Sequence, residues 1–378
     1  MPSTAPPLPI IGKNQSQNIK LARVLCILFM MTTHAWPGSE RILAANLSWP
    51  SHALLFVVVD IFGRASVPLL STISGLLLVS SFARRGTPSV ILGKFKTLVV
   101  PLVFWSIPMA IIAFAEGIWI DNRVPAWTPI EWVNAFFSIT SEPANGPLHF
   151  FRDIFVMVLY ACLILPVFRW NRWAGMALAL AIALLEQKAG GFLVFRNQIA
   201  VFFIAGLLLT LSGKAEWVPR WPLVAVLMLA YAALGFYGVL DENSSDLATM
   251  RFSQLFPRLT VSILMWRICA DIAAHLARLA ERLKSLEPDI FVVFCSHAIT
   301  AKFFALLALV AGLTENAWYY PAFLTLQTVV FVMVGWVLAR ILAPFPWLRG
   351  RSRQEKSAKG WRPVLTGLGR PREKSEPN

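Results

Sequence analysis

Charged residues are scarce in this chain of 378 residues, and their scarcity excludes most soluble folds. Only 14% of the residues are Asp, Glu, Lys or Arg, whereas 57% are hydrophobic and the mean hydropathy is +0.63. A soluble globular domain carries about 25% charged and roughly 45–50% apolar residues. The composition therefore predicts a polytopic membrane protein built from apolar helices.

Cysteine is also sparse, and its placement excludes a disulfide framework. Cys26, Cys162, Cys269 and Cys295 lie singly inside apolar stretches and show no paired spacing. Isolated thiols in such stretches are typical of small buried hydrophobic side chains. The sequence also lacks a Gly-rich phosphate loop, a metal-ligand cluster and a Ser-x-x-Lys arrangement, so we expect no metal and no permanently bound cofactor.

The two ends of the chain differ in composition from its middle. The first 17 residues are polar and rich in proline, and they lack the basic segment, short apolar core and cleavage site of a signal peptide. We expect 1–17 to be a polar N-terminal segment and 18–345 to be one membrane domain. Residues 346–378 are basic and contain Pro, Ser and Gly throughout, which is typical of a disordered cytoplasmic tail on anionic lipid.

A window of about twenty residues, the length that crosses a bilayer core, finds ten apolar segments. The second is too long for one straight helix, and we expect it to begin at the interface and to break near Gly63 and Pro68. The sequence thus predicts an all-α bundle of about ten transmembrane helices. The segments are 18–36, 54–82, 93–115, 149–168, 173–186, 196–212, 220–240, 256–276, 289–312 and 320–344.

Basic and acidic side chains alternate between the loops that join these segments. Lys and Arg follow the even-numbered segments, as Arg84 and Arg85 follow the second, whereas acidic residues follow the third, seventh and ninth. Short loops rich in Lys and Arg stay on the cytoplasmic side of a membrane. We therefore predict that both termini are cytoplasmic.

The first segment carries two ionisable side chains inside its apolar run, Arg23 and His34. They are 11 positions apart, so they share one helix face about 16 Å apart along the axis. An ionisable group within a bilayer normally faces water or a partner. We expect both to face a water-filled channel, with His34 toward the outer side and Arg23 toward the inner. The alternatives are an Arg23 that snorkels to the headgroups and an interfacial His34 bonded to a backbone carbonyl.

Further ionisable side chains lie inside or at the edges of the other segments. Two pairs, Asp60 with Arg64 and Arg267 with Asp271, have the i,i+4 spacing of a helical ion pair. A structural ion pair is the simplest interpretation of each. The others are Lys94 and Lys96 before the third segment, His149, Arg152 and Asp153 by the fourth, Arg196 at the sixth, Arg258 in the eighth and His297 in the ninth.

Five stretches, taken in order, resemble the signature elements of acyltransferase family three, integral membrane enzymes that acylate sugars and other hydroxylated acceptors. The first is the pair Arg23 and His34, an arginine and a histidine separated by ten residues. The other four are GRASVPLLSTISGLLL, KFKTLVVPLVFW, GPLHFFRDIFVM and FCSHAI. Each element alone is weak, but five in the right order, reaching to about residue 345, make the resemblance specific.

Two departures from the family pattern bear on specificity. His149 stands where the family usually has Trp, which implies a different acyl or acceptor group, and Leu70 and Ser71 replace a Phe pair. The opening segment and the Arg152–Asp153 pair look closest to the branch that attaches succinyl groups to bacterial exopolysaccharides such as succinoglycan or to periplasmic glucans. The resemblance implies a multi-pass protein of the bacterial inner membrane.

The chemistry that the resemblance implies is acyl transfer from acyl-CoA, succinyl-CoA before acetyl-CoA, to a hydroxyl of a polysaccharide or lipid-linked sugar. We expect His34 to be the general base, because an imidazole can take the hydroxyl proton and then protonate the departing thiolate. A covalent acyl intermediate on His34 is a variant of this scheme. Arg23 would bind a phosphate or the pantetheine carbonyl of acyl-CoA, or orient neighbouring groups.

Basic side chains elsewhere are the expected substrate contacts. A guanidinium binds a carboxylate or a phosphate through two hydrogen bonds, so it suits a succinyl carboxylate or the pyrophosphate of a lipid-linked sugar. Lys94 and Lys96 would steer acyl-CoA to the inner mouth. The expected substrate-binding residues are Arg64, His149, Arg152, Arg196 and His297.

A transporter or flippase that moves a lipid-linked sugar or an organic anion is the alternative function. Ten segments with intramembrane charges fit a proton-coupled transporter equally well. That function leaves the ordered elements unexplained, and the two halves show no matched Gly- or Pro-broken segments of the kind found in inverted repeats. We expect no nucleic-acid partner despite the net charge of +14, and self-association stays open.

Overall fold

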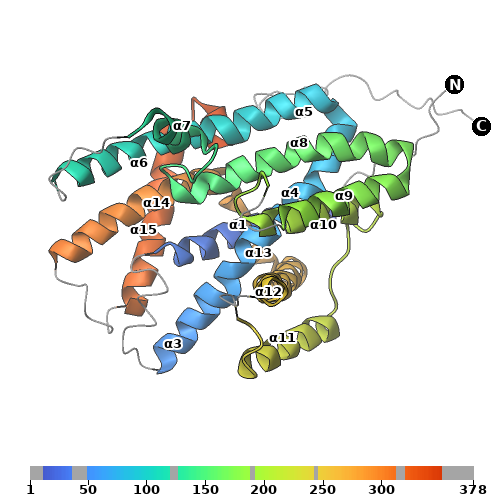
Figure 1. The fold of residues 1–378 in the computed structure, drawn as a ribbon. Coiled ribbons are helices and arrows are strands. Elements are labelled where there is room, and N and C mark those ends of the chain that lie inside the picture. The colour runs from blue at the N-terminus through green and yellow to red at the C-terminus, as the bar shows by residue number, and fades with distance from the viewer. Residues whose placement is uncertain are drawn as a thin grey trace, which may run out of the picture.

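The computed structural model describes residues 12–35, 49–119, 127–187, 192–241, 246–311 and 320–350. Within these ranges every regular element is a helix, so the all-α class predicted from the composition is confirmed. Figure 1 shows a bundle of helices with α1 in its middle and α11 at its edge. Further helices of the bundle are α3 (Trp49–Leu55), α5 (Thr87–Lys94), α6 (Val100–Trp119), α7 (Pro129–Phe137), η3 (Gly146–Leu148), α8 (His149–Trp170), α9 (Arg172–Glu186), α15 (Tyr320–Ile341) and η6 (Pro346–Arg349).

Helix α1 (Lys13–Thr33) is the centre of the larger hydrophobic core. It packs against α4 (Arg64–Arg85), α12 (Leu247–His275) and α14 (Glu287–Val310). Neighbouring helices, rather than lipid, therefore cover most of its apolar surface. The fully buried side chains of α1 are Leu21, Ala22, Val24, Cys26 and Met31.

Each of the ten predicted segments coincides with a helix, but the helices differ in length. Among the described residues, five helical segments are long and apolar enough to cross a bilayer, or six if a bent pair is counted as one. Helices α10 (Asn197–Leu211) and α11 (Trp221–Phe236) are apolar but shorter. The lengths support a multi-pass membrane protein without showing ten full spans. The five segments are Ala53–Arg85, Thr87–Ile118, Gly146–Trp170, Glu287–Leu307 and Leu324–Ile341.

The expected break in the second segment is wrong. Ala53–Arg85 is one continuous helix of 33 residues, in which Phe56–Gly63 forms the π-helix η1 and Pro68 lies inside α4. The helix changes from π to α at Arg64 and continues past Pro68, which is buried in the bundle. A second π-helix, η2 (Phe95–Val99), also precedes a proline, Pro101.

Helix α12 ends at His275, and the chain then turns by 113° into α13 (Ala277–Ser285). Within α12, Arg267 and Asp271 form the predicted i,i+4 ion pair. Arg267 also donates to the carbonyl of Pro219 at 3.2 Å, which ties α12 to the segment ahead of α11. The pair is therefore part of the scaffold.

Two glycines set the close approach of α4 and α10. A Cβ on Gly75 would lie 2.1 Å from the carbonyl oxygen of Phe203, and a Cβ on Gly206 would lie 2.0 Å from that of Thr72. Both distances are far below van der Waals contact, so each position needs glycine. This reciprocal contact holds α10 against α4, and it thereby places the loop that precedes α10.

Candidate functional site

Three histidines from distant parts of the sequence meet at the end of α1. The ring centroid of His34, which follows the last residue of α1, lies 5.4 Å from that of His297 in α14. His149, the first residue of α8, is near enough to His34 to interact with it electrostatically, and so are Arg196 and Glu142. Four predicted site residues are therefore brought together here. We call these four residues the outer cluster: His34, His149, Arg196 and His297.

The two imidazoles at the centre of the outer cluster differ in exposure. His34 is exposed, whereas His297 is fully buried and its Nδ1 lies 2.5 Å from the carbonyl oxygen of Phe294. Because a carbonyl only accepts, Nδ1 carries the hydrogen, and in the neutral ring Nε2 remains an acceptor. That Nε2 has no partner among the described residues. The exposed ring can thus exchange protons with a substrate, and the buried ring can accept a hydrogen bond.

Two further buried side chains, Asn145 and Trp105, carry polar atoms without partners among the residues that the structure describes, and Asn145 is hydrogen-bonded two residues before His297 in α14. The Asn145 side-chain amide donates to the carbonyls of Trp105 (3.2 Å) and Cys295 (3.1 Å), which ties α6 to α14. The Oδ1 of Asn145 and the Nε1 of Trp105 have no partner in the described part of the chain. An unpaired buried polar group costs about 1–3 kcal/mol, so water or substrate is expected to satisfy these atoms. Sequence analysis missed Asn145, because an isolated Asn in a loop has no distinctive pattern.

Two buried carboxylates hold the loop ahead of α10 through its backbone. Glu186 accepts from the N–H groups of residues 192–194 at 2.9–3.1 Å, and Asp153 accepts from those of residues 195 and 196 at 3.2 and 3.0 Å. Both side chains are fully buried, and Glu186 also accepts from the hydroxyl of Tyr160 at 2.6 Å. Five consecutive N–H groups are therefore fixed by two acids. Sequence analysis missed Glu186, since a Glu at a helix end is usually exposed.

Arg152 serves this scaffold. Its Nε donates to the carbonyl of Ser138 at 3.1 Å, one terminal nitrogen donates to Asp153 at 2.9 Å, and further contacts reach the carbonyls of Leu193 and Ile139. Its guanidinium carbon also lies 4.1 Å from the ring centroid of Phe195. The predicted substrate contact of Arg152 therefore competes with an existing set of protein partners.

Arg196, the arginine of the outer cluster, is more accessible than Arg152. It forms an ion pair with Glu142 at 2.9 Å, and the two side chains are 53% and 50% exposed. Its backbone is held by Asp153, while its guanidinium extends into the accessible region near His34. A guanidinium has five N–H donors, so Arg196 can bind a second acid without losing Glu142.

Arg64 lies at the junction of η1 and α4, beside the end of α1. A Cβ on Gly63 would lie 2.3 Å from Cγ2 of Thr33, so this junction packs directly against the last turn of α1. Arg64 forms the predicted i,i+4 ion pair with Asp60 at 3.1 Å, and the two side chains are 40% and 31% exposed. The ion pair is confirmed, and Arg64 is placed on the His34 side of the bundle.

Arg23 lies at the other end of the apolar part of α1. It forms an ion pair with Glu287, the first residue of α14, at 2.8 Å, and the side chains are 36% and 23% exposed. Lys94 is half-buried and close enough to Arg23 and Arg85 to interact with both electrostatically, while Lys96 in η2 is exposed. We call Arg23, Arg85 and Lys94 the inner cluster.

The water-filled channel expected between Arg23 and His34 is not observed. On the face of α1 between them, Ile27 and Met30 are only 7% and 4% exposed. Neither of the two main cavities found among the described residues is lined by Arg23 or His34. Apolar side chains fill the space that a channel would need, so the two clusters are separate polar sites about 16 Å apart along the helix.

The fold is that of a helical, multi-pass membrane protein, and the family comparison gives its class. The family model of acyltransferase family three, described as an acyltransferase domain, matches residues 16–340. The chain therefore belongs to this family. The resemblance inferred from the five ordered elements is thereby confirmed. Among the described residues, no group of three or more His, Cys, Asp and Glu could hold a metal ion.

The chain is also similar to one characterised protein of a polysaccharide biosynthesis pathway. The chain is 27% identical over 325 residues to the succinoglycan biosynthesis protein ExoH of Rhizobium meliloti (strain 1021), and the match covers 82% of this chain and 84% of that protein. No solved structure matches. The similarity therefore extends over most of both chains.

Proposed function

We propose that this protein is an inner-membrane O-acyltransferase that moves an acyl group, succinyl in preference to acetyl, from cytoplasmic acyl-CoA to a hydroxyl of an exopolysaccharide, a periplasmic glucan or a lipid-linked sugar. Family membership and the relative in succinoglycan biosynthesis support this function. The observation that carries it is the exposed His34 beside the buried His297, with Arg196 near by.

His34 acts as the general base in this mechanism. It takes the proton of the acceptor hydroxyl as the oxygen attacks the thioester carbonyl, and the resulting imidazolium returns that proton to the departing thiolate of CoA. The unpaired Nε2 of His297 accepts a hydrogen bond from the acceptor or from His34, which orients the reacting groups. The proton balance closes without a metal or a further co-reactant.

Arg196 gives the site its preference for a dicarboxylic acyl group. The free carboxylate of succinyl needs a cation where the surroundings are apolar, whereas an acetyl group does not. Arg196 is exposed, near His34, and already holds one carboxylate, that of Glu142. His149 occupies the same region and contributes a second polar contact to the acceptor.

The inner cluster receives the CoA portion of the donor. Because Ile27 and Met30 are buried between the two clusters, the helices packed on this face of α1 must separate for the thioester to reach His34. Arg23, Arg85 and Lys94 bring three positive charges together, and the exposed Lys96 adds a fourth in η2. Such a cluster attracts a nucleotide with several phosphates. The basic loops support an orientation with this end, and both termini, in the cytoplasm.

The test supplies the purified protein with radiolabelled succinyl-CoA or acetyl-CoA and an exopolysaccharide that lacks acyl groups. We expect label in the polysaccharide, more from succinyl-CoA than from acetyl-CoA, and free CoA in equal amount. Arg196→Gln should lower the succinyl rate more than the acetyl rate. A protein that neither binds CoA nor cleaves the thioester would overturn the proposal and would favour transport of a lipid-linked sugar or an organic anion.

A further inference from the structure

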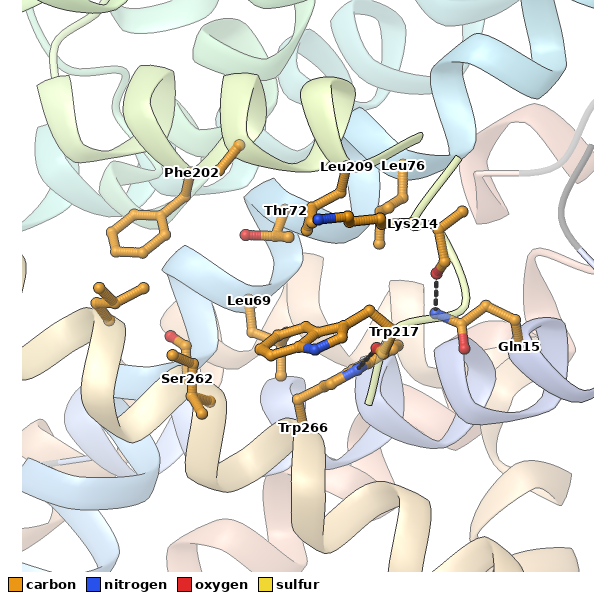
Figure 2. Close-up of a pocket in the computed structure, with 14 residues that line it drawn as sticks. Gln15, Leu69, Thr72, Leu76, Phe202, Leu209, Lys214, Trp217, Ser262 and Trp266 are labelled. Carbon is orange, nitrogen blue, oxygen red and sulfur yellow. Dashed lines mark hydrogen bonds between the residues drawn. The ribbon is translucent and has the colours of Figure 1, made fainter. Parts of the chain in front are cut away.

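A cavity of about 240 Å³ lies between α4, α10 and α12, next to the start of α1. No residue of the outer or inner cluster lines it. Figure 2 shows hydrocarbon side chains on several sides of it, among them Leu69, Leu76, Phe202 and Leu209. An apolar cavity of this kind excludes water and takes up an apolar guest when one can reach it.

Four of the polar side chains that line the cavity donate a hydrogen bond within the protein. Their donors are used as follows: Thr72 to the carbonyl of Pro68 (3.0 Å), Gln15 to Ala215 (2.7 Å), Ser262 to Arg258 (2.6 Å) and Trp266 to Trp217 (3.1 Å). The interior therefore offers little to a sugar or to the amides of pantetheine, because such a guest would lose its hydrogen bonds to water. A hydrocarbon chain has no such bonds to lose.

One lining residue is different. Lys214 is exposed and extends its side chain along the cavity (Figure 2). No hydrogen bond or ion pair of its ammonium group is found with any residue that the structure describes, although its backbone N–H donates to Leu209. An apolar interior with one uncompensated cation at its rim matches a hydrocarbon chain that carries an anionic head.

The cavity is also open to the outside of the bundle. Leu259 on α12 is 43% exposed, and Ala205 on α10 is exposed, although both line the cavity. In a membrane protein, such an opening between helices faces lipid. A phospholipid can therefore insert a chain sideways without passing through the protein.

We propose that this cavity binds one acyl chain of an anionic membrane phospholipid whose phosphate is held by Lys214. The bound lipid wedges between α10 and α12 and contacts α4, so it stabilises the packing around α1. The inference does not depend on the proposed function, because none of the cluster residues takes part in it.

The test uses the purified full-length protein in detergent, supplied with palmitoyl-oleoyl phosphatidylglycerol or with the corresponding phosphatidylcholine. We expect one retained phosphatidylglycerol in the native mass spectrum and a higher unfolding temperature, with no such effect from phosphatidylcholine. Lys214→Gln should weaken phosphatidylglycerol binding about tenfold or more. Arg220→Gln, which removes one charge from the same loop but does not line the cavity, is the matched control and should bind as the wild type does.

A second variant tests the cavity itself. Ala205→Phe places a ring at the opening, where the native side chain is exposed, so the fold should tolerate it while the lipid chain is excluded. Loss of the retained lipid in this variant supports the proposal. Equal binding of both lipids, an equal loss in Lys214→Gln and Arg220→Gln, or full retention in Ala205→Phe would overturn it. The acyl-transfer assay is a separate measurement, so either proposal can fail alone.

Discussion

The two ends of α1 are built differently, although the sequence marks each with one ionisable side chain on the same face. At the inner end, Arg23 is a third exposed and has an acidic partner, Glu287. At the outer end, His34 is exposed and stands beside a buried imidazole, His297. A permanent charge near a helix end needs a counterion or water, whereas a side chain that exchanges protons must stay accessible. This difference is the reason that we propose the chemical step for the outer end and attraction of the donor for the inner end.

Removal of the His34 side chain should have the largest effect on activity. General-base catalysis contributes about 10²–10⁴-fold to a rate, so His34→Ala should lower kcat by at least about 100-fold. Its unfolding temperature should stay near that of the wild type, because the ring is exposed. The matched control is His275→Ala, an exposed histidine at the end of α12, which should keep full activity. Normal acyl transfer by His34→Ala would remove the assignment of this base.

The contact between α4 and α10 can be broken to test how far the outer end depends on its scaffold. Gly206→Ala places a methyl group 2.0 Å from the carbonyl oxygen of Thr72, so the helices must separate, at a cost of about 1–3 kcal/mol in unfolding free energy. Gly235→Ala on α11 is the matched control, since no atom lies within 4 Å of the new Cβ. Thermal unfolding of the two variants measures the difference. Equal stability would show that the glycine contact is not required.

Glu186 offers a finer test of the same region. Glu186→Gln keeps one carbonyl acceptor but removes the charge that three backbone N–H groups share, so we expect a loss of about 1–2 kcal/mol in stability. If the loop positions Arg196, the KM for succinyl-CoA should rise while that for acetyl-CoA changes less. Glu216→Gln, an exposed glutamate, is the control. An equal change in both KM values would limit Glu186 to a structural role.

Composition and local spacing correctly predicted the all-α class, the positions of the helices and two ion pairs. Hydropathy located helices at all ten predicted segments, and i,i+4 spacing predicted the pairs Asp60–Arg64 and Arg267–Asp271. These features depend on a single helix, so the sequence contains what is needed. The predicted break near Pro68 failed because the tendency of proline to end a helix is local, and packing in the bundle overrides it: Pro68 is buried inside α4.

The arrangement of the site depends on contacts between residues far apart in the sequence, and local sequence patterns do not predict such contacts. The spacing of Arg23 and His34 gave their common face, but the burial of Ile27 and Met30 between them comes from neighbouring helices. The meeting of His34 with His297 joins opposite ends of the sequence. A single sequence can therefore propose the ionisable side chains, while their partners follow only from the packing of the bundle.

The smallest expected effect concerns the inner end, where Arg23 and Glu287 are both partly exposed. An ion pair of this exposure contributes only about 0.2–1 kcal/mol, so a double-mutant cycle of Arg23→Gln and Glu287→Gln should give a coupling energy in that range.

If Arg23 also receives acyl-CoA, Arg23→Gln should raise the KM for the donor several-fold with kcat unchanged. Glu287→Gln should leave that KM unchanged or lower it, because it frees the guanidinium. Added salt should raise the wild-type KM and narrow the gap between wild type and Arg23→Gln, since screening weakens attraction between exposed charges. Identical KM values in all three proteins at low salt would reduce Arg23 to a structural ion pair and leave donor binding to Lys94 and Arg85.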